Sequence, residues 1–145
     1  MTITIRESTL ETAVSMHERL PEFDGHELGY YEDRIDDKKS LVIIAYVDEE
    51  PAGYLISYDR YGDGSFYCWL AGVLTEFRKK GVLKKMMNYL YDWAKLRGYK
   101  KILIKTRNKR REMLSYLTRN GFDIVRVSRR EPQSENRILL EKKLS

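Results

Sequence analysis

The stretch that decides the fold runs from Phe66 to Gly98 and reads FYCWLAGVLTEFRKKGVLKKMMNYLYDWAKLRG. Its first nine residues are mostly aromatic, aliphatic or β-branched, which is typical of a buried strand. A polar turn from Thr75 to Gly81 follows, and then apolar residues recur at helical spacing, which predicts a long amphipathic helix. Gly98 stands where a left-handed cap would end that helix. The predicted apolar stripe comprises Leu83, Met86, Met87, Leu90, Ala94 and the stem of Arg97.

The turn is therefore a strand-to-helix connection with a basic sequence. It places Arg78, Lys79, Lys80 and Gly81 at the N-terminus of the predicted helix. Backbone N–H groups without a helical partner point outward there, together with the positive end of the helix dipole. The turn therefore predicts a binding site for an anion.

Composition excludes several classes of protein. The chain has 145 residues and is 42% hydrophobic, which predicts one domain spanning residues 1–145. No apolar run approaches the ~18 residues of a membrane span, and one cysteine with two histidines predicts no disulfide and no metal site. We expect a cytoplasmic protein without a membrane partner. The net charge of +5 is concentrated in residues 78–85 and 105–111, each of which is either a solvated face or an anion site.

The remaining elements follow from alternation, helical periodicity and turn residues. A first helix, capped by Ser8 or Thr9 and stopped by Pro21, carries His17 on its inward face, where a hydrogen-bonded core histidine is favoured over a catalytic one. A short second helix is expected within residues 22–39, and a shorter one over residues 109–119. The predicted strands are residues 2–6, 41–47, 53–60, 66–74, 101–105, 124–128 and 137–144. The strand at 101–105 follows a helix and should run parallel to that at 66–74.

The turn carries a recognisable motif, which reads Val73-x-x-Glu76-Phe77-Arg78-x-x-Gly81-Val82 and precedes a Leu- and Met-rich helix. This order resembles the acyl-CoA-binding motif of the GNAT superfamily of N-acetyltransferases, with Thr75 in place of its usual proline and Leu83 in place of its second small residue. The resemblance extends over nearly the whole chain. It implies an α/β (α+β) three-layer domain with a central mixed, mostly antiparallel sheet of about seven strands and four helices, splayed between the fourth and fifth strands.

The resemblance also implies acetyl-CoA as the acyl donor, without a metal. The pyrophosphate would bind the helix start, and the pantetheine arm would pair with the strand just before the turn. Gly72 is expected to mark a bulge or bend in that strand. The implied cofactor-binding residues are Ala71, Gly72, Val73, Leu74, Arg78, Lys79, Lys80, Gly81, Val82, Leu83 and Asn108.

The catalytic residues are less clearly marked. The family's reaction is direct attack of a neutral amine on a thioester, with the N–H of Val73 or Leu74 as a candidate oxyanion donor. The strand carries Trp69 where many relatives have a glutamate, and no carboxylate at all. Tyr116 is either the general acid that protonates the thiolate or a flanking aromatic. Cys68, inside the strand and remote from histidine, is not expected to act as a nucleophile.

The acceptor cleft is expected beside residues 22–39. The candidate substrate-contacting residues are His26, Tyr30, Tyr31 and Trp69. Such an aromatic lining would suit an apolar or cationic acceptor, although plain core packing explains it equally well. The leading interpretation is an N-acetyltransferase acting on a primary amine of a small molecule or protein, as a monomer or homodimer. The alternatives are a non-catalytic acyl-CoA sensor and, with less support, a basic nucleic-acid-associated protein.

Overall fold

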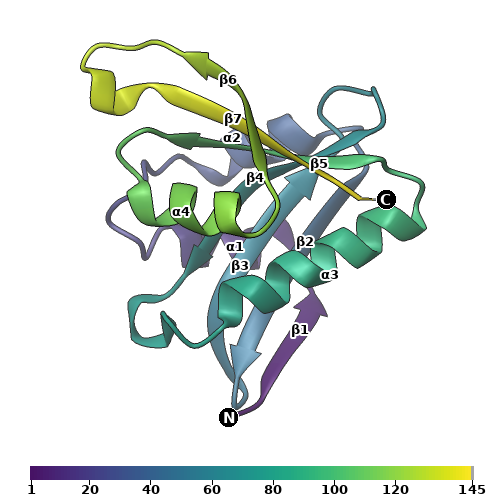
Figure 1. The fold of residues 1–145 in the computed structure, drawn as a ribbon. Coiled ribbons are helices and arrows are strands. Elements are labelled where there is room, and N and C mark those ends of the chain that lie inside the picture. Colours follow the sequence, from purple (N-terminus) through teal and green to yellow (C-terminus); the bar gives the residue numbers. More distant parts are fainter. Residues whose placement is uncertain (145) are drawn as a thin grey trace.

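A computed structural model describes residues 1–144 and contains one sheet of seven strands in the order β1-β2-β3-β4-β5-β7-β6 (Figure 1). All neighbouring strands are antiparallel except β4 and β5, which are parallel as the intervening helix requires. β7 inserts between β5 and β6, so that β6 is the edge strand. The strands are β1 (Ile3–Glu7), β2 (Ser40–Val47), β3 (Glu50–Tyr58), β4 (Ser65–Val73), β5 (Lys101–Arg107), β6 (Asp123–Ser128) and β7 (Arg137–Lys143).

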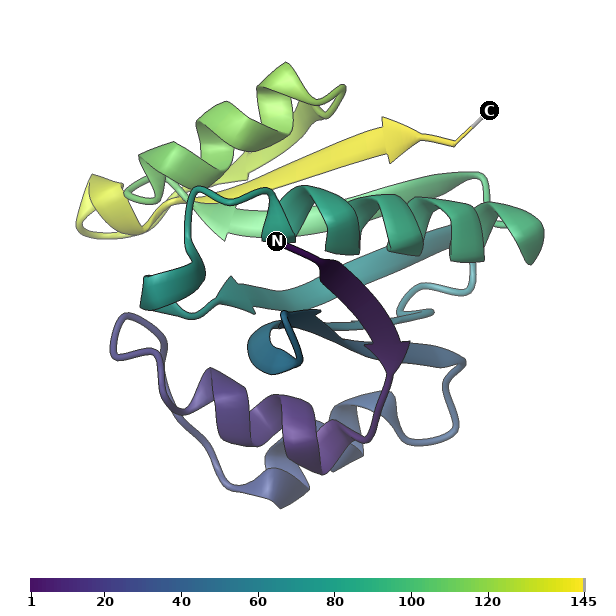
Figure 2. The ribbon, with the colours of Figure 1, turned by 90° about the horizontal axis from the view of Figure 1, so that it is seen from below.

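Helices cover both faces of the sheet, which gives the three layers expected from the sequence. Figure 2 shows α1 and α2 on one face and α3 and α4 on the other. The face under α3 buries one core cluster that includes Phe66 and Cys68, and the face under α1 buries a second that includes Tyr54 and Ile56. The α-helices are α1 (Leu10–His17), α2 (Leu28–Ile35), α3 (Val82–Leu96) and α4 (Arg111–Arg119), with short 3-10 turns at Thr75–Phe77 and Gln133–Glu135.

The predicted long helix exists, with a small rotation of its buried stripe. Val82 and Trp93 are buried together with Met86, Met87, Leu90 and Ala94. Leu83 is only half-buried against this core, and Arg97 is exposed, with its guanidinium 3.9 Å from the centre of the Trp93 ring. Gly98 has a φ of 86° and ends the helix in the left-handed region, as predicted.

β4 and β5 pair for only part of their length and then separate. Their parallel register runs from Ser65–Lys101 to Cys68–Ile104 and ends there. At that point Trp69 is an extra residue in β4, because Ile56 of β3 pairs with Leu70 while Ser57 pairs with Cys68. A bulge increases local twist and bends its strand, so it directs the end of β4 away from β5. The expected splay between the fourth and fifth strands is confirmed.

The bulge does not fall at Gly72, where it was expected. Gly72 pairs regularly with Tyr54 of β3. Its missing side chain has a steric cause, since a Cβ there would lie 2.6 Å from the Tyr54 hydroxyl oxygen and 2.7 Å from Leu20 Cδ1. The glycine therefore makes room for a buried tyrosine of the neighbouring strand.

Candidate active site

The connection between β4 and α3 has the form of an anion-binding turn. Gly81 caps α3 with a φ of 84°, and Lys79 is also left-handed with a φ of 63°. A Cβ at Gly81 would meet no atom within 4 Å, so its backbone conformation, not crowding, explains the glycine here. The N–H groups of Val82, Leu83 and Lys84 open the helix and have no i−4 partner within it. Three N–H donors and the positive end of the helix dipole are therefore available to bind an anion at this end of α3.

The free edge of β4 offers a second set of backbone groups. The Leu74 N–H donates to the Ala52 carbonyl oxygen of β3 at 2.8 Å. Because antiparallel pairing alternates along a strand, Gly72 and Leu74 direct their polar groups at β3, while Ala71 and Val73 direct theirs into the opening beside β5. Ala71 and Val73 are therefore suited to bind an amide-bearing chain laid along this edge, whereas the Leu74 N–H is already occupied.

The Arg78 side chain is committed to two partners of this protein. Its Nε donates to the Val73 carbonyl oxygen at 3.0 Å, and its terminal nitrogen pairs with the Glu22 carboxylate at 2.5 Å. Arg78 therefore occupies the Val73 carbonyl oxygen on the free edge of β4, and it links the turn to the segment between α1 and α2. The lysines beside it, Lys79 and Lys80, are exposed at the turn and form no ion pair among residues 1–144.

A pocket of about 430 Å³ lies where β4 and β5 separate. The four aromatic residues predicted to contact substrate all line it. The His26 and Tyr30 rings stack with centroids 3.9 Å apart, and Tyr31 lies 5.6 Å from the Trp69 ring. The short helix α2 brings Tyr30 and Tyr31 against Trp69 at the bulge of β4, and His26, in the segment before α2, packs on both tyrosines. Local sequence does not reveal this proximity.

The rest of the lining is strongly basic. Among residues 1–144, six Lys and Arg side chains and a single carboxylate, that of Asp24, line the pocket. The basic residues are Arg34, Arg60, Lys105, Arg107, Arg110 and Arg137. Lys105 and Arg107 belonged to a predicted basic cluster, but Arg34, Arg60 and Arg137 were not identified from the sequence because they are far apart in the chain.

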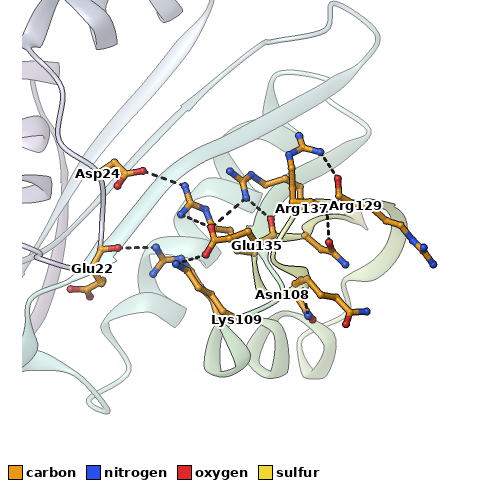
Figure 3. Close-up of polar contacts among 12 residues, drawn as sticks. Glu22, Asp24, Asn108, Lys109, Arg129, Glu135 and Arg137 are labelled. Carbon is orange, nitrogen blue, oxygen red and sulfur yellow. Dashed lines mark hydrogen bonds and ion pairs between the residues drawn. The ribbon is translucent and has the colours of Figure 1, made fainter.

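Some of these cations are neutralised by a network around one residue, Glu135 (Figure 3). Its carboxylate pairs with Lys109 at 2.6 Å, Arg107 at 3.1 Å and Arg137 at 3.7 Å. Arg107 also reaches Asp24 at 3.4 Å. The network thus joins the α1–α2 segment, the β5–α4 loop and the β6–β7 loop at one mouth of the pocket.

Two predicted residues lie away from the pocket lining. The Asn108 amide nitrogen donates to the Gln133 carbonyl oxygen at 3.3 Å, so this side chain holds the β6–β7 loop. Tyr116 of α4 is half-buried and packs against the core on the α3 side of the sheet. Burial raises the pKa of the Tyr116 hydroxyl, which keeps it protonated near neutral pH.

Two buried titratable residues have structural roles. His17 is 3% exposed, bonds through Nδ1 to the Tyr54 hydroxyl at 2.5 Å and stacks on Phe23, in agreement with the predicted core histidine. Burial lowers its pKa, so the ring is neutral near pH 7. Cys68 is 1% exposed, and burial raises its pKa to about 12, which leaves it an unreactive thiol.

The fold and the opened sheet agree with comparisons to known proteins. Residues 5–122 match the model of the acetyltransferase (GNAT) family, and the chain therefore belongs to this family. No curated protein sequence matches the chain significantly. Within residues 1–144, no group of three or more His, Cys, Asp or Glu side chains is arranged to hold a metal ion, and no helix has the length and apolar character needed to cross a membrane.

Solved structures with low identity share the fold. The ribosomal-protein-S18-alanine N-acetyltransferase of Escherichia coli superposes with a TM-score of 0.82 at 14% identity, covering 99% of this chain and 95% of that one. Ard1 of Thermoplasma volcanium gives 0.82 at 15% identity, with coverages of 99% and 98%. A GNAT acetyltransferase of Elizabethkingia anophelis with acetyl-CoA bound gives 0.75 at 18% identity, with 97% of each chain covered.

Proposed function

We propose that this protein is an acetyl-CoA-dependent N-acetyltransferase that acts on a primary amine. The observation that carries the proposal is the opening between β4 and β5, which has a helix start suited to an anion at one end and a concave pocket suited to an acceptor at the other. Membership of the GNAT family and the acetyl-CoA bound to the Elizabethkingia relative support the choice of donor.

The residues around the opening fit the donor. Val82, Leu83 and Lys84 offer backbone N–H groups to the pyrophosphate, and Lys79 and Lys80 add positive charge. The free N–H and carbonyl groups of Ala71 and the free N–H of Val73 would pair with the amides of the pantetheine arm. The donor supplies an acetyl thioester. In the overall reaction the amine nitrogen forms the new C–N bond, the C–S bond breaks, and the proton lost by nitrogen balances the one gained by sulfur.

The protein's own contribution to the chemistry is chiefly electrostatic. A basic pocket disfavours an ammonium ion, so it lowers the pKa of a bound amine and favours the neutral, nucleophilic form. The lowered amine pKa reduces the need for a carboxylate base to deprotonate the amine, and β4 carries no such carboxylate. We assign the protonation of the departing sulfur to the Tyr116 hydroxyl, which is protonated near neutral pH.

Isothermal titration with acetyl-CoA and a thiol-release assay with primary amines test the proposal. Lys80→Glu places a carboxylate beside the proposed pyrophosphate site, and we expect acetyl-CoA affinity to fall at least tenfold. Lys100→Glu makes the same charge change beyond the other end of α3 and should bind like the wild type. Absence of acetyl-CoA binding by the wild-type protein would refute the proposal.

The second candidate is a sensor that binds acyl-CoA without turnover. The observation in its favour is that β4, from Ser65 to Val73, carries no carboxylate to serve as a base. The two candidates differ in one result. A sensor binds acetyl-CoA and releases no thiol with any amine, whereas the enzyme releases thiol in proportion to the acetylated amine.

A further inference from the structure

We propose that the acceptor is a small amine that also bears an anionic group, a carboxylate or a phosphate, which Arg60 and Lys105 bind. This inference rests on the proposed acetyltransferase function and specifies the substrate class of the same site. It follows from the charge of the pocket, from the partners that its cations have and lack, and from its size.

The cations at the two sides of the pocket differ in how they are compensated. Arg107 and Arg137 share the Glu135 carboxylate, and Arg110 donates to the Glu22 carbonyl oxygen at 2.9 Å. No ion pair within residues 1–144 involves Arg34, Arg60, Lys105 or Arg110. Arg34 donates to the Tyr30 hydroxyl oxygen at 3.2 Å, whereas Arg60 and Lys105 have no side-chain hydrogen-bond partner among these residues. Both line the pocket and lie close enough to repel each other. Two uncompensated cations converging in a concave site form a binding site for an anion.

The surroundings of Lys105 intensify this positive field. Its pKa is lowered, first by burial and then by the charges of Arg60, Arg126, Arg130 and Arg137. These charges repel the Lys105 ammonium, and the repulsion disfavours its charged form. An anionic ligand would relieve it and gain Coulomb energy from several cations at once. The same field would reject a polyamine or another cationic acceptor.

The aromatic residues Tyr30, Tyr67 and Trp69 of the pocket lining do not favour a cationic acceptor either. Their rings already hold guanidinium groups of the protein itself. Arg34 lies 5.3 Å from the Tyr30 ring and 5.7 Å from the Trp69 ring, and Arg60 lies 4.9 Å from the Tyr67 ring. These contacts satisfy the ring faces by cation–π attraction and fix the two arginines beside the pocket.

The volume of the pocket suits a small acceptor. About 430 Å³ lies near the lower end of small-molecule sites, so the pocket is suited to an amino acid or a phosphorylated amine. An acceptor of this kind presents its amine to the opening at Trp69 and its anionic group to Lys105. These two positions are adjacent, because the β4–β5 pairing ends at Cys68–Ile104.

The test compares matched amines in the thiol-release assay with acetyl-CoA held constant. Glycine and β-alanine are set against their amides, glycinamide and β-alaninamide, O-phosphoethanolamine is set against ethanolamine, and spermidine serves as the cationic arm. We expect kcat/KM for at least one anionic amine to exceed that of its neutral counterpart roughly tenfold or more, and the advantage to shrink with added salt. Which pair shows the larger ratio distinguishes a carboxylate from a phosphate.

Substitutions assign the preference to the two cations. Lys105→Gln and, independently, Arg60→Gln should each raise the KM of the preferred anionic acceptor roughly tenfold, without weakening acetyl-CoA binding by titration. Lys38→Gln, an exposed substitution in the α2–β2 connection, is the matched control. A thermal-shift measurement with acetyl-CoA present and glutarate or inorganic phosphate added detects the subsite without turnover. The stabilisation by the anion should be lost in both pocket variants.

Three results would overturn the inference while leaving the proposed function intact. These are a preference for neutral amines, a preference for spermidine, or the absence of both anion-dependent stabilisation and anionic turnover, each in a protein that still binds acetyl-CoA. Failure of acetyl-CoA binding itself would instead refute the proposed function. The titration with the donor therefore separates the two failures.

Discussion

Gly72→Ala is a severe test of how β4 packs against β3. The added Cβ would lie 2.6 Å from the Tyr54 hydroxyl oxygen and 2.7 Å from both Tyr54 Cε1 and Leu20 Cδ1. Optimal contacts between such atoms are about 3.5–4.0 Å, so each neighbour must move by roughly 1 Å. Leu20 can rotate only within a full core, since it is 2% exposed, and Tyr54 is 0% exposed. The rigid tyrosine ring cannot yield without moving its backbone.

The cost has two parts. Overpacking of a core typically costs about 1–3 kcal/mol. Displacing the Tyr54 hydroxyl also breaks its buried hydrogen bond to His17, which adds about 1–3 kcal/mol. Replacing glycine by alanine inside a strand stabilises the folded state by only about 0.5–1 kcal/mol. We therefore expect the free energy of unfolding to fall by about 2–4 kcal/mol, which lowers Tm by about 5–12 °C for a domain of this size.

Thermal and urea unfolding, followed by circular dichroism, measure the effect. Gly29→Ala is the matched control, because a Cβ at Gly29 in α2 meets nothing within 4 Å. Its stability should equal or slightly exceed that of the wild type. If Gly72→Ala melts within about 2 °C of the wild type, the packing explanation for this glycine is wrong.

Three further predictions concern titratable residues. Burial lowers the pKa of His17 in the folded protein, so the unfolded chain binds more protons in acid and the free energy of unfolding should fall as the pH decreases below about 6.5. Urea unfolding at pH 7.5 and 5.5 should show this decrease, and the decrease should be smaller in His17→Gln. Cys68, whose pKa is raised to about 12 by burial, should react with a thiol reagent only after denaturant is added, and rapid labelling of the native protein would contradict its burial. Glu135→Gln should lower stability, most clearly at low ionic strength, because three cations lose their shared carboxylate; equal stability at all salt concentrations would show that the network contributes nothing.

Local sequence patterns predicted the elements of this fold well. The Phe66–Gly98 stretch contains a strand, a turn and a helix whose signals are all local: β-rich composition, a basic turn with glycine, and helical periodicity ending at Gly98. The motif in the turn then indicated the family, and the splay followed from the family's architecture. Within this stretch the structure differs from the prediction in the orientation of the helix, which buries Val82 and leaves Leu83 half-buried.

The errors arose where a residue's role depends on a neighbouring strand. Gly72 looked like a bulge because glycine weakens strands, yet its role is to accept the ring of Tyr54 from β3. The bulge occurs at Trp69, which no local signal marks. In the same way, the sequence leaves the Leu74 N–H as a candidate oxyanion donor, but in the structure this N–H donates to the Ala52 carbonyl oxygen of β3.

The sequence by itself determined the order of elements, the turn that suits an anion and the family, because each of these depends on contacts within a few residues or on a contiguous motif. Only the tertiary structure decided the character of the acceptor pocket. Arg34, Lys105 and Arg137 come from three separate elements and Arg60 from the β3–β4 loop. Their charges act together only after the sheet opens at Trp69 and α2 folds against it. Electrostatic energy depends on distance in space and on burial, and neither is encoded at any single position of the chain.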